Sequence, residues 1–271
     1  MATPGVIELE SVVSAKWAVP LRGLVNLKHE EAAGLKNTKV PILLNVHVLE
    51  HPEKGVFIID TGITRDRAAG GHGAVRGLVR SVLSDMESVE PLGDILDRQE
   101  APLAGVFLTH YHIDHVLGLP DVPAGTPIIA GPGEQDPRAL VNGLLKSTYS
   151  ELFENHNRIE VWDFKKGQSM GPILSALDVV GDGSIWALYS PGHTPGSTAY
   201  LANTTDGPKL FVGDTSHTWW GWEHSVEPGD YTEDHERNAE SLRRLRALVH
   251  EYPMIEVFVG HEMDGEGSGV P

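Results

Sequence analysis

Three histidines and an aspartate lie within one six-residue segment, which runs from His110 to His115 and reads HYHIDH. Neutral imidazole and carboxylate are the ligand types that a zinc-like divalent ion prefers, and three protein ligands plus a water make an open, catalytic site. Four such side chains are more than one ion of this kind usually takes. The segment therefore predicts a metal centre and directs attention to further ligands and a second ion.

The elements around this segment should place its side chains around a common point. The preceding run, residues 105–108, has the length and the branched and aromatic residues of a buried strand. Further ligand-type side chains also follow short apolar runs. Asp60 follows 56–59, Asp214 follows 208–213, and His261 follows 255–260, while His193 lies between runs at 184–189 and 197–202.

The remaining elements are read from periodicity and turn residues. We expect strands at 6–13, 41–49, 128–130 and 173–180, and a short helix at 91–98. Residues 17–40 should form a long loop or hairpin, and 131–168, which contain a helix led by Pro137, a cap over the site. Two further helices carry buried stripes: one at 74–86 (Ala74, Val75, Leu78, Val79, Val82, Leu83, Met86) and one at 232–250 (Ala239, Leu242, Leu245, Leu248, Val249).

The pattern His110-x-His112-x-Asp114-His115 resembles the signature of metallo-β-lactamase-fold hydrolases, and Asp60-Thr61-Gly62, His193, Asp214 and His261 stand in family order. The resemblance covers about residues 40 to 262. It implies an α/β fold, a four-layer αββα sandwich of two mixed sheets with outer helices. The alternation of strands and helices in two halves agrees with this. We expect a single domain over residues 1–271.

The resemblance also implies the roles of the site residues. A water shared between two ions about 3.5–4 Å apart would be deprotonated near neutral pH and would attack a carbonyl carbon, while Asp114 passes a proton to the leaving group. Asp60 should support the metal loops through hydrogen bonds without binding an ion. The implied ligands are His110, His112 and His193 for one ion, Asp114, His115 and His261 for the other, and Asp214 as the bridge.

Asp214 narrows the reaction. Mononuclear and β-lactam-cleaving relatives generally have Cys or Ser at this position, so the carboxylate favours the dinuclear lactonases, thioesterases and esterases. Residues 238–248 and 260–262 resemble the corresponding helix and ligand strand of acyl-homoserine-lactone lactonases. We therefore expect a lactonase-like hydrolase of lactones or similar esters. The alternatives are a glyoxalase II-like thioesterase and a β-lactamase-like hydrolase.

The residues after Asp214 are less typical. Several of these lactonases carry a tyrosine three residues after the bridging aspartate, where its hydroxyl assists the substrate carbonyl. This chain has His217, which is either a catalytic helper or a pocket-lining residue. A tryptophan cluster follows, and it forms either a hydrophobic wall for an acyl chain or part of the core: Trp219, Trp220 and Trp222.

Other classes fit less well. Flavodiiron relatives have a glutamate where this chain has His112, and they carry a flavin domain. Sulfur dioxygenase-like oxidoreductases bind a single iron. Non-catalytic proteins of this fold usually lose ligands, whereas all seven are present here. The donor set accepts zinc first, and also iron, manganese or cobalt.

Composition bounds the partners and the location. The formal charge of −17, without a dense basic cluster, disfavours a nucleic acid, and no run of about 18 apolar residues suggests a membrane span. The start lacks a basic segment followed by an apolar one. The absence of cysteine fits a reducing compartment. We expect a cytoplasmic protein with a small-molecule substrate, and a homodimer is an open alternative to the monomer.

Overall fold

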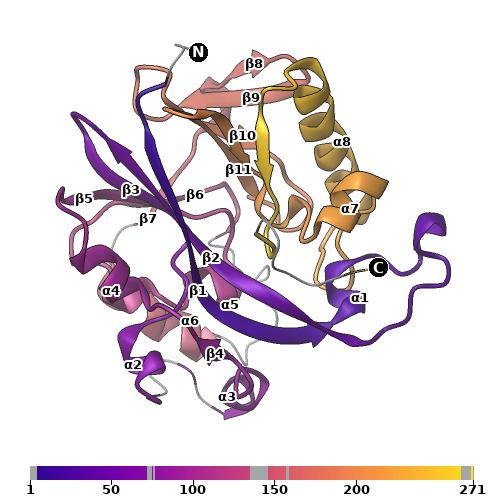
Figure 1. Ribbon diagram of the computed structural model, residues 1–271, viewed down its shortest axis with the longest axis horizontal. Helices are drawn as coiled ribbons and strands as arrows, with labels where there is room; N and C mark the ends of the chain where they lie inside the picture. Colours follow the sequence, from indigo (N-terminus) through magenta and orange to yellow (C-terminus); the bar gives the residue numbers. More distant parts are fainter. Residues whose placement is uncertain are drawn as a thin grey trace.

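Two β-sheets pack face to face in this computed structural model, which describes residues 5–71, 75, 77–134, 146–156, 159–263 and 270 (Figure 1). One sheet has the order β4 (Glu87–Ser88), β1 (Glu8–Pro20), β2 (Lys39–His51), β3 (Gly55–Ile59), β5 (Leu103–Phe107), β6 (Ile128–Ala130), β7 (Ile159–Val161). The other has the order β13 (Glu256–Phe258), β12 (Gly207–Phe211), β11 (Thr198–Thr204), β10 (Ile185–Tyr189), β9 (Ile173–Asp178), β8 (Gln168–Met170).

Both sheets are mixed. In the first, β1, β2 and β3 are antiparallel neighbours, whereas β3, β5, β6 and β7 run parallel. In the second, only β12 and β13 are parallel. The helices are α1 (Leu21–Leu24), α2 (Arg65–Ala68), α3 (Gly77–Val82), α4 (Leu92–Asp97), α5 (Ile113–Val116), α6 (Lys146–Leu152), α7 (Trp219–His224) and α8 (His235–Glu251).

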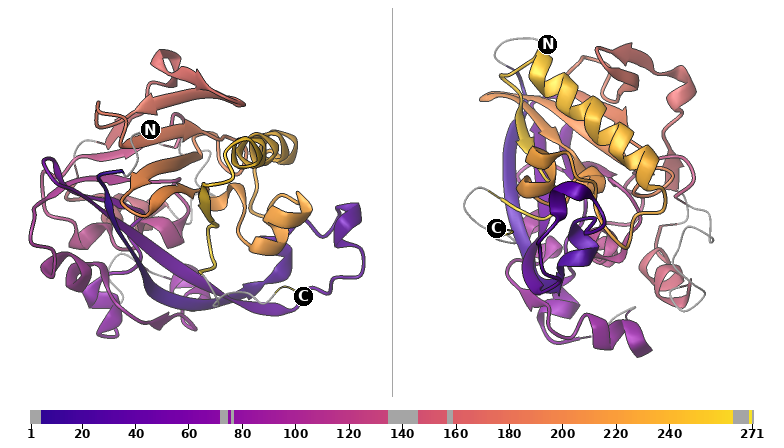
Figure 2. Two further views of the ribbon diagram at one scale, coloured as in Figure 1. Left: turned by 45° about the horizontal axis from the view of Figure 1, so that its top comes forward. Right: turned by 90° about the vertical axis from the view of Figure 1, so that its right-hand side faces the viewer.

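The alternation of buried side chains along the strands creates the layers. On β5, Phe107 faces the other sheet, whereas Val106 faces outward into a cluster with residues of α4, α5 and α6. On β12, Phe211 faces the first sheet, and Leu210 packs outward with leucines of α8. Segments that are buried on both faces read as short apolar runs, as 106–108 and 210–212 do. The expected αββα sandwich is confirmed, and Figures 1 and 2 show α8 and the α4–α6 group on opposite sides.

The first hairpin is longer than expected. Strands were predicted at 6–13 and 41–49, but β1 and β2 pair as far as Pro20 and Lys39, with one register shift between Val13 and Ala15. Of the two alternatives predicted for 17–40, a long loop or a hairpin, the hairpin is the one found. Val19 and Val40 bury apolar surface in a cluster with α1, which outweighs the local turn signals. The hairpin forms the long curved arm in Figure 2, and its connecting segment includes α1 and a 3₁₀ turn, Glu30–Ala32.

Two predicted helical regions also differ. The helix expected at 74–86 is α3 over Gly77–Val82, and Val82, placed in its buried stripe, is 61% exposed. Ala74 lies outside the described residues, as does the Pro137-led segment of the expected cap. In the described part of 131–168, β7 is an edge strand of the first sheet and η3 (Phe164–Lys166) packs between the sheets, so neither belongs to a cap. Within the described ranges, no helix has the length and apolar character needed to cross a membrane.

His47 is buried between the sheets, where it lines a small cavity together with Asp114, His115 and His261. Its Nδ1 is 2.8 Å from Ser11 Oγ, and its ring is 4.4 Å from that of Phe211. Burial lowers the pKa of His47 from 6.5 to about 3, because a charged imidazole is disfavoured in this apolar setting.

This pKa predicts an acid-labile fold. Between pH 6.5 and about 3 the unfolded chain binds a proton at His47 that the folded chain does not. The contribution to the free energy of unfolding therefore falls by about 1.4 kcal/mol for each pH unit as the pH drops through this range. In urea unfolding at pH 7.5, 6.5, 5.5 and 4.5, His47→Gln should lose that slope relative to the unmodified chain. Equal slopes for the two proteins would refute this assignment.

Candidate metal centre

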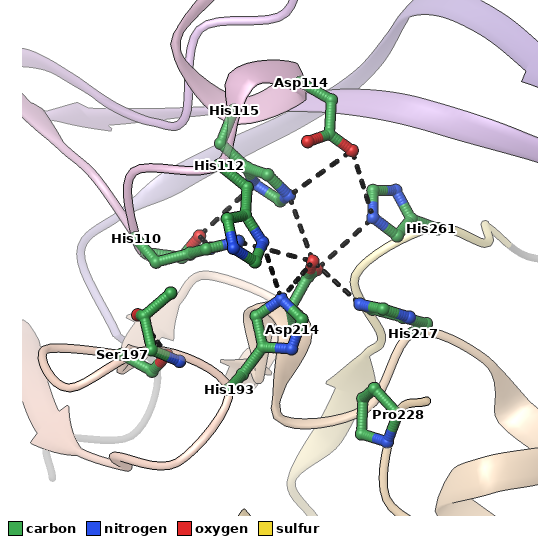
Figure 3. Close-up of polar contacts among 12 residues, drawn as sticks. His110, His112, Asp114, His115, His193, Ser197, Asp214, His217, Pro228 and His261 are labelled. Atoms are coloured by element: carbon green, nitrogen blue, oxygen red, sulfur yellow. Dashed lines mark hydrogen bonds and ion pairs between the residues drawn. The ribbon is translucent and has the colours of Figure 1, made fainter. Parts of the chain in front are cut away.

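The predicted ligands meet because each follows a strand that ends at the same side of the sandwich. His110 and its neighbours follow β5, Asp214 follows β12, and His261 follows β13, while His193 lies in the loop between β10 and β11. Figure 3 shows these side chains pointing toward one another. The structure thus brings together all seven residues that the sequence pointed to.

Two clusters of ligand-type atoms result. The first contains His110, His112, His193 and Asp214, and all four donor atoms lie within 4.8 Å of one another. His193 Nε2 is 2.8 Å from His112 Nδ1. The second cluster contains Asp114, His115 and His261. In that cluster His261 Nε2 is 3.5 Å from Asp114 Oδ2.

Asp214 lies between the two clusters. Its Oδ2 is 3.2 Å from His193 Nε2 and 3.4 Å from His115 Nε2, so one oxygen contacts both sets. Its Oδ1 is 3.4 Å from His261 Nε2. The carboxylate is buried, and the surrounding imidazoles outweigh the effect of burial and hold the pKa of Asp214 well below its usual range. Asp214 is therefore the carboxylate that contacts imidazoles of both clusters.

The remote nitrogen of each of four ligand-type imidazoles has an acceptor. His110 Nδ1 faces Thr109 Oγ1 at 3.1 Å, His115 Nδ1 faces Asp60 Oδ2 at 2.7 Å, His193 Nδ1 faces Thr232 Oγ1 at 3.2 Å, and His261 Nδ1 faces the Leu43 carbonyl at 2.9 Å. An Nδ1–H donated outward leaves the Nε2 lone pair directed inward, which is the usual way a protein orients metal-binding histidines.

Asp60 organises the motif loop from behind. Its carboxylate accepts hydrogen bonds from the Thr109 N–H at 2.8 Å and the Thr109 hydroxyl, as well as from His115. The residue adopts a φ of 58°, a left-handed conformation that aspartate tolerates better than most residues. Asp60 touches ligand side chains and belongs to neither cluster of donor atoms.

The imidazoles of the two clusters differ in pKa. Burial lowers the pKa of His112 to about 3 and that of His193 to about 4, and it lowers the pKa of His110 as well. Burial acts on His115 and His261 in the same direction, but the Asp214 carboxylate outweighs it and raises both pKa values. The three imidazoles of the first cluster are therefore in the neutral, metal-binding form at neutral pH, whereas ion binding at the second cluster displaces protons.

Several inward-facing atoms make no hydrogen bond within the described residues, although they lie 3.4–3.5 Å from carboxylate or imidazole atoms. His110 Nε2, His115 Nε2 and Asp214 Oδ1 are buried and accept or donate no hydrogen bond within the described part of the chain. Buried polar atoms are normally paired, so three such atoms around one point need an explanation. Divalent ions satisfy all three at once, and the donor set of imidazoles and carboxylates suits them.

His217 differs from the other imidazoles. Its Nε2 is 2.8 Å from Asp214 Oδ2, but its buried Nδ1 has no hydrogen-bond partner within the described residues. An unpaired Nδ1–H would be costly, so the proton belongs on Nε2, which donates it to Asp214. His217 also groups with Asp214 and His261 as a potential ligand, but this tautomer directs a donor, and not a lone pair, at the centre.

The tryptophans after His217 divide between core and surface. Trp222 is buried among leucines of α8, so it belongs to the core. Trp219 and Trp220 are half-buried, and Trp220 stacks on His224 with ring centroids 4.2 Å apart. The backbone N–H of Trp219 donates to Glu262 Oε2 at 2.6 Å, which fixes the start of α7 beside His261.

Sequence reasoning missed two residues that tie the ligand loops together. Asn238 accepts a hydrogen bond from the His193 N–H and donates one to the Thr215 carbonyl, so it links the loops of His193 and Asp214. Glu134 is buried and contacts the loops of both His112 and His193. Asn238 lies in a helical stripe of apolar spacing, which was the available signal, but nothing around Glu134 indicated its contacts.

Comparison with known proteins places this geometry in a family. The Metallo-beta-lactamase superfamily model matches residues 42–261. A gamma-lactamase of Gibberella moniliformis is 31% identical over 174 residues, which are 59% of this chain and 70% of that protein. The N-acyl homoserine lactonase AttM of Azorhizobium caulinodans is 26% identical over 244 residues, 88% of each chain.

A solved structure supports the same fold. It is an AiiA mutant of Bacillus thuringiensis with N-decanoyl-L-homoserine bound at its active site, and the two chains superpose with a TM-score of 0.70 at 21% identity, over 94% of this chain and 93% of that one. The family model covers both clusters and all the loops that carry them. This chain is a member of the metallo-beta-lactamase superfamily.

Proposed function

We propose that this protein is a lactonase-like hydrolase that uses two divalent metal ions to open a lactone or a similar ester. One observation carries the proposal: seven imidazole and carboxylate side chains form two adjacent clusters around Asp214. A single bound ion would leave ligand-type atoms of the other cluster buried and unpaired. The similarity to AttM over most of both chains supports the lactone as substrate class.

In this proposal His110, His112 and His193 would hold one ion, and Asp114, His115 and His261 would hold the second. Asp214 lies close enough to both clusters to contribute to each ion. Two such ions supply a deprotonated water near neutral pH and polarise the carbonyl of the substrate. Zinc is the ion we expect, because it favours nitrogen and carboxylate ligands, with iron, manganese and cobalt as alternatives.

The chain contributes two further groups to the reaction. Asp114 is the more exposed of the two clustered carboxylates, with 14% of its side chain accessible against 3% for Asp214, so it can reach a leaving group. We assign it the proton transfer to the alkoxide. The Nε2–H of His217 donates to Asp214 Oδ2 in this structure, and we propose that it turns to a substrate carbonyl oxygen when Asp214 binds metal. The half-buried Trp219 and Trp220 are the proposed wall for an apolar substituent.

A second reaction is favoured by a specific similarity. The gamma-lactamase relative has the higher sequence identity, although over a shorter part of this chain. Opening a lactam uses the same attack on a carbonyl, but the leaving group is a nitrogen. Because this nitrogen is more basic than an alkoxide oxygen, its departure depends more strongly on protonation. Lactams therefore belong in any substrate test, together with thioesters.

The test combines metal content with a substrate panel. Purified protein should contain close to two equivalents of zinc-like metal, and it should hydrolyse acyl-homoserine lactones or simple lactones faster than matched thioesters and lactams. Dialysis against a chelator should abolish turnover, and added Zn²⁺ should restore it. Turnover of thioesters or lactams with complete inactivity on every lactone would reject the lactonase assignment.

We propose a cytoplasmic location because a chain without cysteine suits a reducing compartment.

A further inference from the structure

Both backbone polar groups of Tyr111, the N–H and the carbonyl, are hydrogen-bonded to side chains from a distant part of the chain. This residue lies between His110 and His112, two members of the first cluster. Its N–H donates to Glu134 Oε2 at 2.7 Å, and its carbonyl accepts from the Tyr149 hydroxyl at 2.7 Å. The backbone between His110 and His112 is therefore positioned by contacts that neither of these two histidines makes itself.

The other oxygen of Glu134 binds the second loop of the same cluster. Glu134 Oε1 accepts hydrogen bonds from the Gly196 N–H at 2.8 Å and from the Thr194 hydroxyl at 2.5 Å. Thr194 directly follows His193. The contact is close: a Cβ at position 196 would lie 2.8 Å from Glu134 Oε1. One carboxylate thus joins the loop that carries His110 and His112 to the loop that carries His193.

We propose that Glu134 is a positioning residue that sets the distance between the two halves of the first metal cluster. Glu134 is 1% exposed, and the cost of burying its carboxylate is offset by the three hydrogen bonds that it accepts. The three groups that donate hydrogen bonds to Glu134 come from two loops about 80 residues apart in the chain. One loop carries His112 and the other carries His193, and these two side chains are in contact at 2.8 Å. This inference rests on the proposed function because it requires an ion at that cluster.

A glutamine at this position provides a sharp test, since it keeps the volume and changes one acceptor into a donor. If its amide nitrogen takes the place of Oε2, it opposes the Tyr111 N–H. If it takes the place of Oε1, it opposes the Gly196 N–H. Glutamine can therefore satisfy one loop at a time, and both orientations uncouple the loops. A residue that served only for packing would be replaced by glutamine without loss.

The experiment measures Zn²⁺ affinity at each cluster separately. Metal-free protein is titrated with Zn²⁺ in competition with a chromophoric chelator, in two backgrounds. His261→Ala disables the second cluster, and His112→Ala disables the first. Glu134→Gln is added to each, and near-UV circular dichroism of every variant reports on folding. Tyr149→Phe, which removes the hydroxyl that donates to the Tyr111 carbonyl, serves as the matched change on the backbone of the same residue.

We expect Glu134→Gln to weaken Zn²⁺ binding about 10- to 100-fold in the His261→Ala background, the range seen when outer partners of ligands are lost. In the His112→Ala background the affinity should stay within about twofold. Tyr149→Phe should show a smaller loss with the same selectivity. Unchanged affinity at the first cluster, or equal losses at both, overturns the proposal. Failure of the proposed function looks different, because the unmodified chain itself would then bind fewer than two Zn²⁺.

Discussion

Replacement of Asp214 by alanine is expected to lower kcat/KM for the best lactone by about a thousandfold or more and to reduce the metal content below one equivalent per chain. Asp214 contacts imidazoles of both clusters within 3.5 Å. A lost metal ion removes several kcal/mol of transition-state stabilisation, and about 4 kcal/mol corresponds to roughly three orders of magnitude in rate. Metal analysis and steady-state kinetics on the same preparation test this.

Asp214→Asn is the matched control for size. It keeps an oxygen that can bind an ion and removes the negative charge that offsets the surrounding imidazoles. We expect it to retain more metal than Asp214→Ala while its kcat/KM stays well below that of the unmodified chain. If Asp214→Ala kept two ions per chain and more than a tenth of the activity, a bridging role for this carboxylate would be untenable.

Asp114→Asn is expected to reduce kcat for lactones by a factor on the order of 10²–10⁴, the usual contribution of a positioned proton donor. The amide oxygen can still bind an ion, so the metal content should stay near two equivalents. An ester with a 4-nitrophenolate leaving group, which departs without a proton, should lose far less. The ratio of the two rate losses is therefore the measurement that isolates proton transfer from metal binding.

His217→Phe gives the comparison for that ratio. Because the proposed donation from His217 Nε2 acts on the carbonyl oxygen, its loss should slow lactone and 4-nitrophenyl ester by similar factors. If the rate losses of His217→Phe depended on the leaving group as those of Asp114→Asn do, the assignment of proton transfer to Asp114 would be wrong. Equal losses on both substrates for Asp114→Asn would mean that Asp114 acts only as a ligand.

Family and layer architecture were accessible from the sequence for a physical reason. Ile58-Ile59 and Val106-Phe107 are buried on alternating faces, so short unbroken apolar runs predict central strands. The ligand-type residues stand directly after such runs, where a strand ends and side chains can converge. The hairpin and helix boundaries were less predictable, since the pairing of Val19 with Val40 depends on apolar partners that are distant in the sequence.

The types and the order of the metal-type side chains, and the strands that precede them, were determined by the sequence alone, because they depend on local spacing and on which atoms can bind an ion. The tertiary structure decided how those side chains are held. The outward acceptors of the imidazoles, the donor tautomer of His217 and the two-loop contact of Glu134 each arise where segments distant along the chain meet. A backbone N–H or carbonyl carries no sequence signature, so contacts to Tyr111, Gly196 and Leu43 become visible only once the fold brings them together.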